Sequence, residues 1–175
     1  MKAPPEAPPP LPAALAALTG QGVAAIDTPA AVIDLDAMER NLARMAAFAR
    51  THGVRLRPHA KMHKSAFLAR LQMRAAAVGV CVQKTSEAEA LAATGVTDIY
   101  ISNLVIDASK LQRVAALAQR LQAAGGRLAI AVDSLEGIAR LEAAFEALAA
   151  GTAPPLVDVF VEIDVGQGRC GVPPG

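Results

Sequence analysis

The chain has 175 residues, which is enough for one domain with a buried core and short for two domains with a linker. Its 17 lysines and arginines nearly balance 16 aspartates and glutamates, so the net charge of +1 provides no field that would attract nucleic acid or an anionic membrane. Aromatic residues make up only 3%, which argues against a platform for stacking nucleic-acid bases. We therefore expect small polar molecules as substrates, with no nucleic-acid or membrane partner.

The expected compartment is the cytoplasm. Cys81 and Cys170 match no zinc spacing and are too few to form a disulfide framework. The start of the chain is rich in proline and lacks the apolar core of a signal peptide. We assign residues 1–25 to a disordered or weakly helical tail and residues 26–175 to one domain.

Short apolar runs then alternate with helical patterns. Residues 30–35 predict a strand, and Asp36 with Glu39 predicts a capping box that opens a helix ending at Gly53. Helices are expected from Ser65, from Ser86 with Glu89 three residues on, and from a second capping box of Asp133 and Glu136. Between them, another helix has a face lined by Leu111, Val114, Leu117 and Leu121. The buried face of the last helix is expected at Ile138, Leu141, Phe145 and Leu148. These helices separate five further expected strands, at residues 54–58, 78–82, 99–102, 128–132 and 157–163.

The spacing of these strands predicts a parallel sheet. Connections of about 20 to 30 residues that contain a helix have the length of a parallel crossover. Continuous apolar runs such as residues 128–132 are typical of strands covered on both faces. The pattern fits an open doubly wound sheet or part of an eight-stranded (β/α)8 barrel. A sequence that stops after a strand favours an incomplete barrel of about five βα units.

In both architectures, functional groups gather at the carboxyl ends of the strands. These positions hold the segment around Lys61, then Gln83 and Lys84, then Asn103, Asp133 and residues 164–171. Residues 55–64 combine several cations with two histidines, which predicts either a solvated basic loop or an anion site with a lysine for covalent chemistry. Residues 162–171 place Arg169 in a loop with three glycines, which by itself is weak support for a site.

Two of these segments resemble a known family. Residues 57–64, Arg-Pro-His-Ala-Lys-Met-His-Lys, resemble the cofactor-lysine motif of the D-threonine aldolase and D-serine dehydratase family, relatives of alanine racemase with a barrel of its type. In that family the motif lysine holds pyridoxal 5'-phosphate as an imine, and Lys61 is the matching position. Residues 164–171 are similar to the segment whose arginine lies near the cofactor's phenolic oxygen, and Arg169 occupies that place. Residues 82–90 and 132–136 also match, so the resemblance covers about residues 26–175.

The resemblance implies a pyridoxal phosphate-dependent lyase that acts on D-β-hydroxy amino acids, either as an aldolase for D-threonine or D-3-hydroxyaspartate or as a D-serine dehydratase. Lys61 would be catalytic, and His59, Gln83 and Arg169 would contact the cofactor. His59 has a second interpretation, as a residue that anchors the loop.

The resemblance also describes what this chain lacks. Complete family enzymes add a C-terminal β domain that brings the ligands of a divalent metal and often takes part in a dimer. That β domain is expected to be absent here, so we name no metal ligand in this chain. Two alternatives remain open, a non-catalytic pyridoxal phosphate-binding protein and an inactive truncated fragment.

Overall fold

The computed structural model describes residues 12–151 and 153–175, and the chain divides into two compact units, Met1–Met38 and Glu39–Gly175. The predicted tail lies outside the described residues as far as residue 11. From residue 12 it contains the short helix α1 (Ala13–Ala16) and the 3-10 turn η1 (Val23–Ala25), neither of which has a buried residue.

The prediction of a strand at residues 30–35 is wrong. This segment has no regular structure, and helix α2 (Leu35–Thr51) begins at its end. Asp34 caps that helix, since its Oδ1 accepts a hydrogen bond from the Ala37 amide at 2.9 Å. The predicted capping box of Asp36 and Glu39 therefore lies within the first turns of the helix. Residues 30–35 pair with no described strand, and an extended segment without a neighbour has no ladder to hold it.

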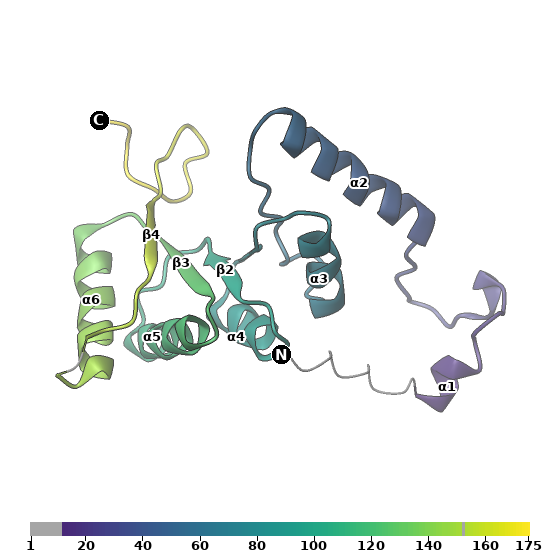
Figure 1. Ribbon diagram of the computed structural model, residues 1–175, viewed down its shortest axis with the longest axis horizontal. Coiled ribbons are helices and arrows are strands. Elements are labelled where there is room, and N and C mark those ends of the chain that lie inside the picture. The colour runs from purple at the N-terminus through teal and green to yellow at the C-terminus, as the bar shows by residue number, and fades with distance from the viewer. Residues whose placement is uncertain (1–11, 152) are drawn as a thin grey trace. The chain divides into compact units, whose positions relative to one another are not determined.

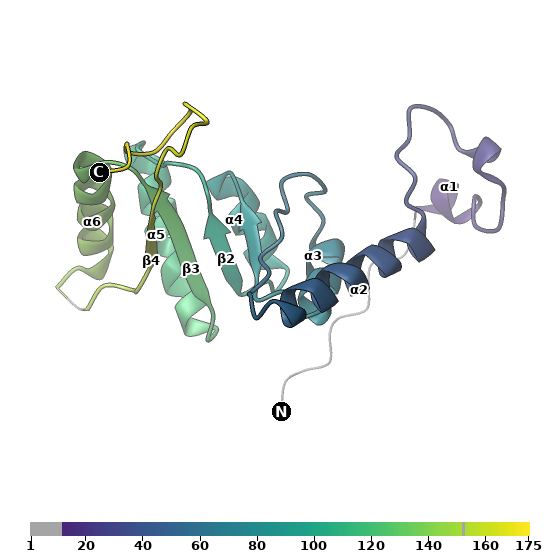
Figure 2. The ribbon, with the colours of Figure 1, turned by 90° about the horizontal axis from the view of Figure 1, so that it is seen from above.

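The second unit contains a parallel four-stranded sheet in the order β1-β2-β3-β4. Its strands are β1 (Val80–Val82), β2 (Asp98–Ile101), β3 (Arg127–Val132) and β4 (Asp158–Val161). Helices alternate with them as α3 (Ala66–Arg74), α4 (Thr85–Ala93), α5 (Ala108–Ala123) and α6 (Leu135–Ala149). Helices α4, α5 and α6 lie along one side of the sheet (Figures 1 and 2). Sequential strand order with helices on one side is the arrangement of a barrel wall, whereas a doubly wound sheet reverses its order and is covered on both faces.

The strand predicted at residues 54–58 exists only as a short parallel pairing with β1. His59 and Cys81 form an isolated bridge, the Cys81 amide donates to the Pro58 carbonyl at 2.8 Å, and the Ala60 amide donates to the Cys81 carbonyl at 2.7 Å. Pro58 has no amide hydrogen, which shortens any ladder through this segment. The pairing still places residues 59 and 60 beside β1 in the order that a first barrel strand would have.

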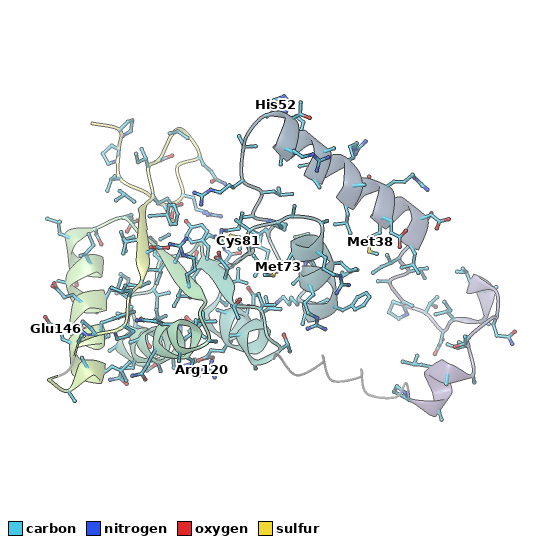
Figure 3. All side chains as sticks on the ribbon, in the orientation of Figure 1. Met38, His52, Met73, Cys81, Arg120 and Glu146 are labelled. Atoms are coloured by element: carbon cyan, nitrogen blue, oxygen red, sulfur yellow. The ribbon has the colours of Figure 1, made fainter. Side chains whose placement is uncertain are left out.

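The core lies between the sheet and the helices, and the predicted helical faces mostly form it. Leu111, Val114, Leu117 and Leu121 of α5 are buried, as expected. On α6 Leu141 and Phe145 are buried, but Ile138 is 39% exposed, so the buried stripe of that helix is narrower than predicted. Figure 3 shows Cys81 within the sheet and Arg120 and Glu146 on the helical layer.

Strand β4 departs from the expectation of strands covered on both faces. All four of its residues are exposed, whereas β1 is wholly buried and β3 is buried from Leu128 to Val132. In the described part of the chain β4 pairs with β3 on one side only. An edge strand has unpaired backbone amides and carbonyls, and exposed apolar side chains such as Phe160 lie beside them here. Such an edge readily pairs with another strand.

Two predicted helix caps are shifted by one or two residues. Helix α4 begins at Thr85 rather than after Ser86, and the carboxylate that closes its first turn belongs to Glu87 instead of Glu89. Helix α6 is capped by Ser134, whose Oγ accepts from the Gly137 amide at 3.1 Å. The side chain of Asp133, which we expected to cap α6, is bonded elsewhere.

Candidate functional site

Lys61 lies in a tight turn directly after the segment that pairs with β1. Ala60 before it is buried, and the Lys64 amide closes the turn with a 2.8 Å hydrogen bond to the Ala60 carbonyl. Lys61 is half-buried, and no described residue forms a hydrogen bond or an ion pair with its Nζ. The turn therefore presents an uncommitted primary amine at the carboxyl edge of the sheet.

His59 anchors this turn through both ring nitrogens. Nδ1 accepts from the Lys61 amide at 3.3 Å, so the hydrogen-bond pattern places the ring proton on Nε2, which faces Ser102 Oγ at 3.4 Å. Ser102 in turn donates to the Val82 carbonyl at 3.1 Å. Burial, together with the charge of Lys61, lowers the pKa of His59, which favours the neutral ring that this pattern requires. The imidazole thus ties the Lys61 turn to the ends of β1 and β2.

Two other cations of this segment are paired with carboxylates. Arg57 Nη1 lies 2.7 Å from Asp98 Oδ1, and Lys64 Nζ lies 3.2 Å from Glu87 Oε1. The dense positive charge of residues 55–64 is therefore partly neutralised, which the sequence pattern did not indicate. His63 differs, because its Nδ1 accepts from the Ser65 amide while its buried Nε2 has no hydrogen-bond partner in the described part of the protein.

Glu87 is a site residue that the sequence reasoning missed. One carboxylate oxygen accepts from the amides of Gln83 and Lys84, and the other faces Lys64. Burial opposes ionisation, but these hydrogen bonds and the Lys64 ammonium outweigh it and lower the pKa of Glu87. The available signal was its place as the third residue of α4, where a carboxylate commonly satisfies free amides.

The loop after β4 carries Arg169. Asp164 Oδ1 accepts from the Gly166 and Gly168 amides at 2.9 and 3.0 Å, and these bonds lower the pKa of Asp164. Beyond Arg169, the Gly171 amide donates to Asp133 Oδ2 at 3.2 Å. Figure 1 shows this loop in yellow, beyond the end of β4. The Arg169 side chain is exposed and forms no hydrogen bond or ion pair with a described residue.

A bridge between Ile163 and Val172 closes the base of the same loop. The Asp164 amide donates to the Val172 carbonyl at 2.9 Å, and the Val172 amide donates to the Glu162 carbonyl at 2.9 Å. The loop is therefore closed by an ordered parallel bridge, whereas three glycines alone would suggest a flexible turn.

The predicted site residues all follow strand ends, but only two of them are in direct contact. His59 and Lys61 are hydrogen-bonded, while no hydrogen bond or ion pair links Arg169 to Lys61, His59 or Gln83. Gln83 follows β1 and lines a cavity of about 350 Å³ together with Asn103 and residues of the α4 and α5 starts. Asn103 has only a weak local contact, from its side-chain amide to the Leu104 carbonyl at 3.5 Å.

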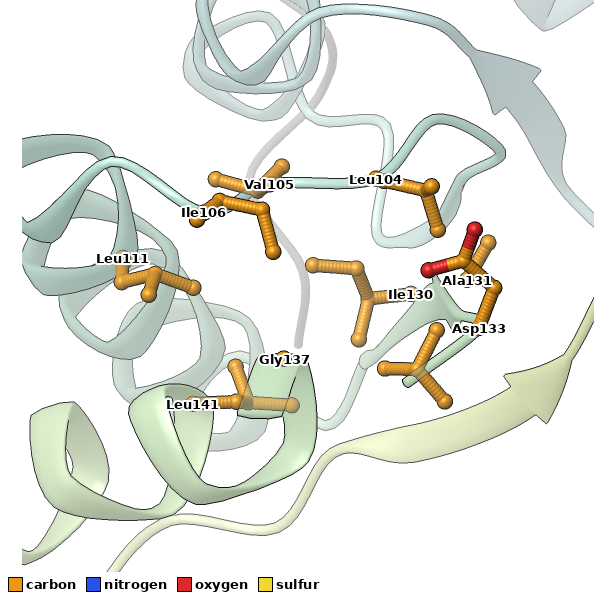
Figure 4. Close-up of a pocket in the computed structure, with 10 residues that line it drawn as sticks. Leu104, Val105, Ile106, Leu111, Ile130, Ala131, Asp133, Gly137 and Leu141 are labelled. Atoms are coloured by element: carbon orange, nitrogen blue, oxygen red, sulfur yellow. The ribbon is translucent and has the colours of Figure 1, made fainter. Parts of the chain in front are cut away.

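A second cavity lies at the carboxyl end of β3, where Asp133 is the charged residue in a mainly apolar lining (Figure 4). Its wall combines the loop before α5 with side chains of β3, α5 and α6, including Ile106, Leu111, Ile130 and Leu141. Its volume of about 10 Å³ is no larger than the space needed by one water molecule. This cavity is a packing gap of the core and cannot hold a cofactor.

Residues 33–175 match the family model described as "Alanine racemase, N-terminal domain". The chain belongs to the alanine racemase N-terminal domain family. The expected fold, part of an alanine racemase-type α/β barrel, is therefore confirmed, and the strand order described above fits it.

Several proteins similar to this chain are named as aldolases or dehydratases. It is 45% identical over 157 residues to a 3-hydroxy-D-aspartate aldolase of Paracoccus denitrificans, covering 89% of this chain and 38% of the relative. It is 42% identical over 153 residues to a D-threonine aldolase of Arthrobacter sp, covering 87% and 38%. The crystal structure of D-threonine aldolase from Filomicrobium marinum superposes with a TM-score of 0.80 at 46% identity, covering 87% of this chain and 39% of that one.

The chain thus spans less than two fifths of the length of these relatives. Among residues 12–151 and 153–175, no group of three or more His, Cys, Asp or Glu side chains is arranged to hold a metal ion. In the same described part, no helix has the length and apolar character that a membrane crossing requires.

Proposed function

We propose that this chain is the cofactor-lysine portion of a pyridoxal phosphate-dependent lyase that acts on D-β-hydroxy amino acids, with Lys61 as the residue that binds the cofactor covalently. The observation that carries the proposal is the Lys61 turn. An amine that pairs with no described residue follows the segment paired with β1, at the strand ends where parallel α/β folds place their sites. The names of the relatives supply the reaction class.

The residues present fit such a cofactor. An aldehyde needs an accessible primary amine, and Lys61 Nζ has no competing partner among the described residues. The buried Nε2 of His63, two residues further on, is a donor with no acceptor among the described residues and is free to bond an anionic group. When bound, pyridoxal phosphate supplies an electron sink for bond cleavage at the α-carbon of an amino acid.

Each residue of the proposed site has a distinct role. Lys61 provides the nucleophilic amine, and neutral His59 holds the turn in place through Ser102. Arg169 offers guanidinium donors that would hydrogen-bond the cofactor's phenolic oxygen and keep it anionic. Gln83, which lines the cavity beside β1, would contribute an amide contact.

Substrate and metal follow from the family resemblance. A D-amino acid with a β-hydroxyl would be the substrate, and cleavage of either the Cα–Cβ bond or the β-hydroxyl distinguishes aldolase from dehydratase. A divalent metal held by the β domain of a complete family enzyme would lower the pKa of that hydroxyl. We assign no metal ligand to this chain, and we propose a homodimer for the complete enzyme.

The direct test of the proposal is covalent capture. Purified protein is mixed with pyridoxal phosphate, reduced with borohydride and digested, and mass spectrometry locates the modified lysine. We expect the label on Lys61, and its loss in Lys61→Ala but not in Lys84→Ala, which removes an exposed lysine beyond β1. A label spread evenly over several lysines would reject Lys61 as the cofactor residue.

Two further measurements divide the remaining roles. Arg169→Leu should shift the absorbance titration of the bound cofactor, and an unchanged titration would exclude contact with the phenolic oxygen. Assays for glycine release from D-threonine and for pyruvate release from D-serine, on the enzyme with its β domain, separate aldolase from dehydratase. The absence of both products would favour the non-catalytic binding protein.

A further inference from the structure

We infer that Glu87 is a positioning residue for Lys61, acting through its ion pair with Lys64. The inference rests on the proposed function for its catalytic meaning, but its geometry is independent of it. Glu87 belongs to α4, and Lys64 closes the turn that carries Lys61. The ion pair therefore links the reactive turn to the helix after β1, across 23 residues of sequence.

The Glu87 carboxylate is held more firmly than a surface acid. Its side chain is only 12% exposed, and Oε2 is fixed by the amides of Gln83 and Lys84 at 3.1 and 3.2 Å. These amides directly precede Thr85, the first residue of α4, so Oε1 is presented to Lys64 from a defined position. A mostly buried acid with both oxygens occupied forms a fixed anchor rather than a solvated charge.

The turn requires an anchor of this kind. Lys64 has a φ of 49°, in the left-handed region that side chains other than glycine rarely adopt. Its backbone nevertheless donates to Ala60 at 2.8 Å, which keeps the turn closed. The ion pair at 3.2 Å holds the Lys64 side chain and so stabilises this unfavourable backbone conformation.

The same carboxylate lies close enough to affect the histidine of the site. The negative charge of Glu87 opposes the two effects that lower the pKa of His59, burial and the Lys61 charge. The Lys61 turn is therefore fixed on one side by His59 and Ser102 and on the other by Lys64 and Glu87. Loss of either anchor would let the amine move while the sheet stays intact.

Glu87→Gln is the informative variant. The glutamine oxygen can keep both amide hydrogen bonds at the start of α4, while the amide nitrogen that replaces Oε1 cannot pair with an ammonium. Lys64→Met removes the other partner, Lys64→Arg keeps a cation, and Glu136→Gln breaks the exposed pair with Arg140 on α6 as a matched control.

The first measurement is amide hydrogen exchange at Lys64 without cofactor, corrected for intrinsic rates. We expect about two- to fivefold faster exchange in Glu87→Gln and in Lys64→Met, the range for one partly exposed ion pair. The double variant should be no faster than either single one, because both remove the same interaction. Lys64→Arg and Glu136→Gln should exchange like the parent, and an unchanged rate in Glu87→Gln or Lys64→Met would overturn the inference.

The second measurement is the rate of covalent capture of pyridoxal phosphate at Lys61 as a function of its concentration. A displaced amine should lower the limiting rate by a similar factor and leave the half-saturating concentration unchanged. A change confined to the half-saturating concentration would overturn the positioning role. If the parent itself captures no cofactor at Lys61, the proposed function fails, whereas the exchange experiment still decides the role of Glu87 in the turn.

Discussion

The loop that carries Arg169 offers a prediction whose size can be derived from contacts. Gly171 has a φ of +102°, and a Cβ built on it would lie 2.6 Å from the Asp164 amide nitrogen and 2.8 Å from the Ile163 carbonyl carbon. These neighbours are backbone atoms that form the base of the loop, so they cannot move without breaking it. Gly171→Ala should therefore open the loop.

Three hydrogen bonds are affected by this substitution. They are the two backbone bonds of the bridge, Asp164 amide to Val172 and Val172 amide to Glu162, and the bond from the Gly171 amide to Asp133. At about 1 kcal/mol each they contribute roughly 3 kcal/mol. The strained φ of alanine adds about 1–2 kcal/mol. The free energy of loop opening should therefore fall by about 4–5 kcal/mol. At about 1.4 kcal/mol per tenfold, this raises the opening equilibrium constant by roughly a thousandfold.

Gly168→Ala is the matched control in the same loop. Gly168 also has a positive φ, +64°, but a Cβ there would meet nothing within 4 Å. Its cost should be the backbone strain alone, about 1–2 kcal/mol, which corresponds to roughly 5- to 30-fold.

Amide hydrogen exchange at Asp164 and Val172 measures this opening directly. Exchange should accelerate far more in Gly171→Ala than in Gly168→Ala, while the buried amide of Ile130 in β3 stays as slow as in the parent. Equal acceleration in the two variants would refute the close approach at Gly171 and the argument built on it.

Three further predictions concern the core, the cofactor and the pH dependence of stability. Leu111→Ala, at a side chain that is 1% exposed, should lower the free energy of unfolding by about 2–5 kcal/mol in urea titrations, whereas Leu135→Ala, 86% exposed, should change it by about 0.5 kcal/mol or less; similar losses would contradict the burial pattern. His59→Ala should reduce the limiting rate of cofactor capture at Lys61, because the turn loses its hydrogen bond to Ser102. The half-saturating concentration of the cofactor should change little. Capture at the parent rate would show that the histidine is dispensable. The pKa of Glu87 is lowered in the folded protein, so its stabilising contribution is present above the unfolded pKa of about 4.3 and is lost as the pH falls through the folded pKa. Between about pH 6 and pH 3, the free energy of unfolding should therefore fall more in the parent than in Glu87→Gln. Parallel curves of unfolding free energy against pH would contradict this.

The sequence alone predicted much of this protein's architecture, because the signals involved are local. The apolar spacing of Leu111, Val114, Leu117 and Leu121 defines one face of a helix whatever surrounds it. The crossover lengths require parallel strands, and the segment around Lys61 identifies a family through its residue types. The position of Lys61 after a strand-like segment followed from the same order of elements.

The errors occurred where local signals compete. Asp34 and Asp36 both favour a helix start, and Glu87 and Glu89 both suit a capping role near α4. Residue type cannot distinguish positions one or two apart, because the first helical residue also depends on the path of the chain before the helix. The apolar residues 30–35 suit a strand, but a strand also needs a partner, which propensity does not supply.

Only the tertiary structure decided which polar and charged groups meet. Arg57 and Asp98, Lys64 and Glu87, and Gly171 and Asp133 are 41, 23 and 38 residues apart, and each pair spans at least one helix. The sequence therefore determined that an amine follows the first parallel segment, while the packing of that segment against β1, β2 and α4 determined how the amine is held. Side-chain pairing across a sheet depends on register and loop path, which no short stretch of residues encodes by itself.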